Sequence, residues 1–63
     1  MKSEPIGPIE ALKLAVSKEA DSIKLYQRLN TDHPVAKDIL LFLGNEEEKH
    51  KKMLEEKIRE LTR

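Results

Sequence analysis

Apolar residues recur along this chain at alternating spacings of three and four, which places their side chains on one face of an α-helix. One such row lies in the first half of the chain and consists of Ile9, Leu12, Val16, Glu19, Ile23 and Tyr26. A second row lies in the second half and consists of Ala36, Leu40, Leu43, Glu47, His50, Leu54, Lys57 and Leu61. The two rows predict two amphipathic helices, each with polar residues in the middle of its apolar face.

Proline and turn-forming residues indicate where the two helices begin and end. Pro8 suits the first turn of a helix, where its missing N–H has no helical partner in any case. The chain then carries no glycine or proline until Pro34. We therefore expect a first helix over about residues 8–29, a turn over 30–34 and a second helix over about 34–61.

The short turn makes the two helices antiparallel neighbours, so the predicted fold is an all-α helical hairpin. Residues 1–7 are expected to form an irregular lead-in to this single domain over residues 8–63. Thr31 or Asp32 is expected to cap the second helix. Gly44 interrupts that helix; it marks either the close approach of another helix or a tolerated defect. One hairpin leaves its apolar face half covered, so we expect two hairpins to dimerise into a four-helix bundle.

Composition narrows the classes of function. The chain has 63 residues and no cysteine, which excludes disulfides, thiolate zinc sites and iron–sulfur clusters. A chain this short usually needs a metal or a partner subunit for stability. Twelve basic and twelve acidic side chains balance, so no basic field favours nucleic acid or an acidic membrane surface. The longest apolar run, residues 39–43, is far too short to span a membrane, and the cytoplasm is the expected compartment.

The polar residues inside the two apolar rows indicate a metal site. Glu47 and His50 lie three residues apart on one helical face, and Glu19 occupies the middle of the other row. Buried without partners, these groups would be costly, and a shared metal ion is an economical partner. Two hairpins would offer four carboxylates and two imidazoles, a set that suits two iron or manganese ions and does not exclude zinc. A competing register would point Glu46 rather than Glu47 inward, alongside Met53. As a separate alternative, Glu19 would be a surface residue that pairs with a nearby lysine.

The segments Glu19–Tyr26 and Asn45–Leu54 resemble the rubrerythrin branch of the ferritin-like di-iron proteins. The chain corresponds to half of such a domain, and in this it also resembles the encapsulin-associated ferritins. The resemblance implies a ferritin-like four-helix bundle made by two chains, with two iron ions per dimer. It also implies that Glu47 bridges the metals, that Glu19 and His50 complete each coordination sphere, and that Tyr26 donates a hydrogen bond to a carboxylate.

The function that this resemblance implies is redox chemistry at the dinuclear site, either Fe(II) oxidation by dioxygen or peroxide, or peroxide reduction. Peroxide reduction would need a separate electron-donor protein, because the chain has no cysteine for a rubredoxin-type centre. The expected assembly is a homodimer or a larger even-numbered homo-oligomer. Two alternatives stay open: a metal-free helical interaction module, and a structural metal site without turnover. Tyr26 as simple core filler is a further alternative.

Overall fold

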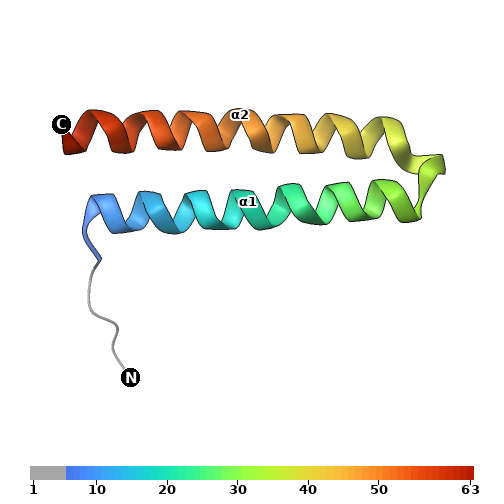
Figure 1. Ribbon diagram of the computed structural model, residues 1–63, viewed down its shortest axis with the longest axis horizontal. Coiled ribbons are helices and arrows are strands. Elements are labelled where there is room, and N and C mark those ends of the chain that lie inside the picture. The colour runs from blue at the N-terminus through green and yellow to red at the C-terminus, as the bar shows by residue number, and fades with distance from the viewer. Residues whose placement is uncertain (1–5) are drawn as a thin grey trace, which may run out of the picture.

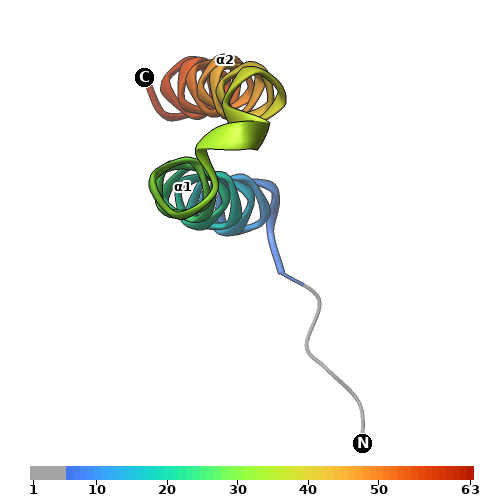
Figure 2. The same cartoon turned by 90° about the vertical axis from the view of Figure 1, so that its right-hand side faces the viewer.

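Two long α-helices joined by a short 3₁₀ turn make up the protein, whose computed structural model describes residues 6–63. Helix α1 spans Pro8–Asp32, the turn η1 spans Pro34–Ala36, and helix α2 spans Lys37–Thr62. The helices run antiparallel and side by side along their whole length (Figures 1 and 2). No strand occurs in residues 6–63, which confirms the predicted all-α fold.

Helix α1 begins as the sequence predicts. Gly7 is extended, with φ −74° and ψ 170°, and Pro8 follows in the first turn. The Ala11 N–H donates to the Gly7 carbonyl at 2.9 Å, which starts the helical hydrogen-bond pattern. Of the expected irregular lead-in over residues 1–7, Ile6 and Gly7 precede the helix, and residues 1–5 lie outside the described residues.

The end of α1 differs from the expectation. The helix continues past residue 29 to Asp32, where the Thr31 hydroxyl donates back to the Gln27 carbonyl at 3.2 Å and the His33 N–H donates to the Leu29 carbonyl at 2.8 Å. A side chain bonded to its own preceding turn cannot cap the next helix, and no side-chain hydrogen bond caps α2, so the predicted cap was wrong. The chain leaves the helix at His33, with φ −134° and ψ 69°, since a residue that precedes proline disfavours the helical region.

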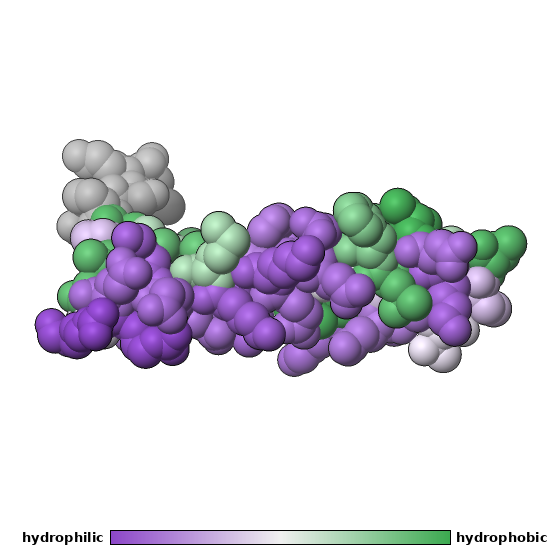
Figure 3. Space-filling model, turned by 90° about the horizontal axis from the view of Figure 1, so that it is seen from above, coloured by the Kyte–Doolittle hydropathy of each residue, from purple (hydrophilic) through white to green (hydrophobic). Residues whose placement is uncertain are grey.

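Contact between only two helices gives the hairpin a thin core. Ile23, at 9% exposure, is the only buried hydrophobic residue in the described part of the chain. Large apolar side chains remain exposed in η1 and at the start of α2, namely Val35, Ile39, Leu41 and Phe42. Seen from above, hydrophobic side chains gather toward both ends of the molecule, at the turn and at the opposite end, while the middle of the surface is hydrophilic (Figure 3). The hairpin therefore leaves much apolar surface open to another chain.

Charged side chains are paired along the exposed surface of α2. Lys51 contacts Glu55 at 3.2 Å and Lys57 contacts Glu60 at 3.0 Å, each pair about one helical turn apart. Such exposed pairs contribute little individually, and together they support a long helix that few tertiary contacts hold. Within residues 6–63, neither helix is both long and apolar enough to cross a bilayer.

Gly44 in α2 faces Tyr26 of α1 without a steric need for glycine. A β-carbon built at Gly44 would stand 3.7 Å from the Tyr26 β-carbon, an ordinary van der Waals distance. The backbone at Gly44 is helical, since no glycine of the described residues has a positive φ. Close approach of the helices within one hairpin therefore does not explain this glycine.

We predict that Gly44→Ala raises the free energy of unfolding by about 1 kcal/mol, because alanine is the better residue in a helix interior. Urea unfolding followed by circular dichroism, with a chelator present, measures the change. Ser17→Ala on the exposed surface of α1 serves as a control for a general gain in helix propensity. A loss of stability in Gly44→Ala would mean that another chain packs closely at this position.

Candidate metal centre

The hairpin register brings the middles of the two apolar rows together. Glu19 and Glu47 lie equally far along the chain from His33 at the turn, so antiparallel packing places them opposite each other. His50 lies one helical turn beyond Glu47 on the same side of α2. The predicted trio Glu19, Glu47 and His50 therefore meets between the helices.

Distances within the trio are short enough for a shared ion. The His50 Nδ1 atom lies 3.3 Å from a Glu47 carboxylate oxygen and 3.6 Å from a Glu19 carboxylate oxygen. One ligand atom from each residue can be chosen so that all lie within 4.8 Å of one another. Both carboxylates approach Nδ1, which leaves Nε2 of the same ring for a different partner.

The competing register, with Glu46 turned inward, is not what α2 adopts. Glu46 pairs with Lys49 on its own helix at 3.3 Å, and the carboxylate that reaches Glu19 and His50 is that of Glu47. One residue changes the direction of a helical side chain by about 100°, so the two glutamates cannot both face α1. Met53, which that register also placed inward, is 68% exposed and lines an open groove together with His50.

An apolar groove adjoins the trio on the open face of the hairpin. The groove has a volume of about 310 Å³, and Glu19, His50, Leu12, Met53, Leu54 and Lys57 line it. The Glu19 and Glu47 side chains are 21% and 23% exposed, whereas His50 is 51% exposed. The carboxylates thus lie between the helices, and the imidazole stands at the edge of a surface that one hairpin cannot cover.

The protonation of Glu19 reflects its neighbours. A hydrogen bond with the Glu47 carboxyl group raises the pKa of Glu19 above its usual range, and desolvation and the charge of Glu47 act in the same direction. The charge and hydrogen bond of His50 oppose this effect. Two carboxyl groups side by side favour sharing a proton when nothing else neutralises them. A metal cation would replace that proton.

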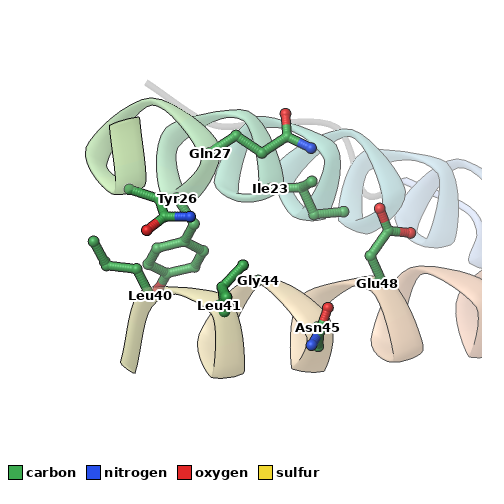
Figure 4. Close-up of a pocket in the computed structure, with 9 residues that line it drawn as sticks. Ile23, Tyr26, Gln27, Leu40, Leu41, Gly44, Asn45 and Glu48 are labelled. Atoms are coloured by element: carbon green, nitrogen blue, oxygen red, sulfur yellow. The ribbon is translucent and has the colours of Figure 1, made fainter. Parts of the chain in front are cut away.

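Tyr26 lies away from the trio. No hydrogen bond joins its hydroxyl to Glu19 or Glu47, and its ring lies between the helices beside Leu40 (Figure 4). There it lines a second cavity, separate from the groove, together with Asn30. The predicted hydrogen bond from Tyr26 to a metal-bound carboxylate stays a prediction, and simple packing describes its place within one hairpin.

Sequence reasoning missed the polar lining of this second cavity. Asn30 was expected only in the turn, yet it lies in the last turns of α1 and its Oδ1 atom is buried without a hydrogen-bond partner. The signal was present in the spacing, because Asn30 follows Tyr26 by four residues and so extends the first apolar row.

Comparison of the chain with protein-family models, curated proteins and solved structures finds no match. The resemblance to the rubrerythrin branch therefore rests on the residues quoted above and stays a prediction.

The raised pKa of Glu19 predicts a pH dependence of the metal-free protein. A raised folded-state pKa gives a contribution to stability that is complete below the ordinary glutamate pKa, about 4.3, and is lost as the pH rises through the folded-state value. Wild type should therefore lose stability across this window, and Glu19→Gln should lose less. Thermal unfolding with a chelator at pH 4–8 measures the difference, with Glu10→Gln on the same helix as the control. Equal pH profiles for wild type and Glu19→Gln would contradict the carboxyl pairing.

Proposed function

We propose that this protein holds a dinuclear metal site between two copies of the chain and carries out redox chemistry there. The reaction is Fe(II) oxidation by dioxygen or peroxide, or peroxide reduction. The observation that supports the proposal is the meeting of Glu19, Glu47 and His50 at mid-height of the hairpin. Three ligand-type residues from two helices converge where the sequence pattern otherwise calls for apolar residues.

The spacing of the donor atoms fits coordination of one ion. Two ligands about 2.1 Å from a metal and about 90–110° apart lie about 3.0–3.4 Å from each other. The His50 Nδ1 atom lies 3.3 Å and 3.6 Å from the two carboxylate oxygens, so a small closure suffices. One imidazole with two carboxylates suits iron or manganese, and zinc fits as well.

One hairpin supplies too few ligands, and its open face supports a second copy as the source of the others. Two copies would contribute four carboxylates and two imidazoles, the donor set of dinuclear carboxylate bundles. Four carboxylates also balance the charge of two divalent cations. The apolar groove beside His50, lined by Leu12, Met53 and Leu54, is the surface that such a pairing would cover. The proposed assembly is a homodimer or a larger even-numbered oligomer.

Each residue has a separate role in this proposal. Glu47, which contacts both Glu19 and His50, would bridge the two ions, while Glu19 and His50 would each complete one coordination sphere. Tyr26 would orient a carboxylate in the assembled dimer. Leu12 and Leu54 would keep water from the site, which strengthens the electrostatic interactions there. Bound iron would supply the electrons for reduction of the oxidant, and for peroxide reduction a separate protein would return them.

Two other functions account for the same cluster. In a metal-free interaction module, a protonated His50 between the two carboxylates would set the register of the helices, as buried polar residues do in coiled coils. In a structural metal site, for example one that holds zinc, the ion would stabilise the dimer without turnover. Oxygen consumption by the iron-loaded protein separates the redox function from both alternatives.

We predict about one iron per chain after anaerobic Fe(II) loading, in a species with an even number of chains. Elemental analysis of fractions sized by light scattering measures this ratio. The double variant Glu47→Ala with His50→Ala should lose the specifically bound iron, because it removes two of the three ligands. Glu46→Ala, one residue away and outside the trio, is the matched control and should keep it. Iron that stays bound to the double variant would contradict the proposed metal site.

We also predict that dimerisation depends on the metal, because the ligands come from both copies. Sedimentation velocity of wild type should show dimer with Fe(II) and a shift toward monomer after chelation. His50→Ala should remain largely monomeric in both conditions, and His33→Ala in the turn should behave as wild type. Dimers of His50→Ala as stable as wild type without metal would instead support the interaction module.

A further inference from the structure

Exposed apolar side chains on α2 gather on the side that carries His50. Because each residue turns a helix by about 100°, Ile39 and Met53 lie about 20° and 60° from His50 around the helix axis. Phe42 lies about 80° from His50, whereas Leu41 lies about 180° away. Ile39, Phe42 and Met53 are 53%, 57% and 68% exposed. The open side of α2 is therefore apolar on both sides of the trio along the chain.

This side of the hairpin is hollow at one end and projects at the other. Toward the open end lies the groove of about 310 Å³, with Leu12, Met53 and Leu54 as its apolar lining. An apolar cavity of about 150 Å³ holds a benzene ring, so the groove has room for a large side chain. Toward the turn, three exposed side chains form a turn-end patch, namely Val35, Ile39 and Phe42.

The turn-end patch and the groove lie at matching distances from the trio. Phe42 precedes Glu47 by five residues, and Met53 follows Glu47 by six. Ile39 precedes Glu47 by eight residues, and Lys57, which also lines the groove, follows Glu47 by ten. A two-fold axis that crosses the helices at the trio therefore brings the patch of each copy onto the groove of the other. Such a mutual exchange is what an isologous contact requires.

Charges near the same axis are complementary. Glu46 precedes Glu47 by one residue and Lys49 follows it by two, so the two-fold axis brings Glu46 level with the partner's Lys49. Glu46 and Lys49 also pair within one copy at 3.3 Å. The two pairs of a dimer would thus adjoin with opposite charges facing each other. Complementary charges of this kind select an orientation more than they add affinity.

We propose that a second copy of this chain docks antiparallel on the His50 side, with its turn-end patch over the groove. Ile39 enters the partner's groove, and Phe42 covers the partner's Met53. The inference rests on the dimer of the proposed function and adds the orientation and the contacts of the two copies. The reverse arrangement, turn against turn, would leave two grooves facing each other unfilled and would press two projecting patches together.

Pairs of single-cysteine variants test the orientation, because the chain has no cysteine of its own. Ile39→Cys and Lys57→Cys, mixed anaerobically with Fe(II) in a glutathione redox buffer, should form a mixed disulfide that mass spectrometry detects. Ile39→Cys with Leu25→Cys should not, although Leu25 is exposed on α1 near the turn. Antiparallel docking separates Leu25 from the partner's Ile39 by about sixteen residues, or about 24 Å along the helix axis. Turn-against-turn docking would bring these two positions together.

Two further variants test the contacts. Phe42→Ala and Ile39→Ala should each weaken the iron-loaded dimer about tenfold or more, because each removes a large apolar side chain twice per dimer. Leu41→Ala, an exposed leucine on the opposite side of the same helix, is the matched control and should dimerise as wild type. Sedimentation equilibrium measures the dissociation constants, and circular dichroism verifies that each variant is folded.

A dominant disulfide between positions 39 and 25, or equal yields of both disulfides, overturns antiparallel docking and leaves the dinuclear site standing. Equal dissociation constants for Phe42→Ala, Ile39→Ala and Leu41→Ala have the same consequence. If the disulfide between positions 39 and 57 forms equally well with a chelator and the protein binds no iron, the docking stands and the proposed metal function fails. Monomers with and without Fe(II) overturn both.

Discussion

The contact line between two helices is the constraint on which the whole structure depends. Two helices side by side can bury only the residues that point directly at the neighbour, and in this hairpin a single hydrophobic side chain, Ile23, is buried. Both faces of the layer stay open, and no second layer shields them (Figure 2). A domain of this size gains little from its own core, so few buried contacts within residues 6–63 stabilise the hairpin.

Against that background, the polar residues at the centre of the contact line are significant. Glu19 and Glu47 occupy positions where apolar residues would add to a core that needs them. The carboxyl groups compensate in part by sharing a hydrogen bond, and this raises the pKa of Glu19. A polar network between helices is favourable only when every member has a partner, and each carboxyl group here serves the other in that way.

The two faces of the hairpin differ in chemistry because a helix turns by about 100° per residue. His50 and the groove with Met53 belong to one face of the hairpin. Glu48 and the second cavity belong to the other face. The first face places His50 among the apolar side chains of Leu12, Met53 and Leu54. The second face combines the apolar side chains of Ile23 and Leu40 with the polar side chains of Asn30 and Glu48. A single layer of two helices thus presents two faces of different chemistry.

The sequence by itself determined the number, the type and the approximate extent of the helices, because apolar periodicity and proline positions act locally. It also determined the trio, since the spacing of Glu47 and His50 and the distance of Glu19 from the turn follow from chain geometry. Packing decided what local rules leave open. Only the contact between helices placed Tyr26 beside Leu40 away from the carboxylates, and left the Oδ1 atom of Asn30 buried without a partner. The second cavity also depends on packing, because side chains from two helices line it. No single stretch of sequence records which side chains of the two helices will face each other.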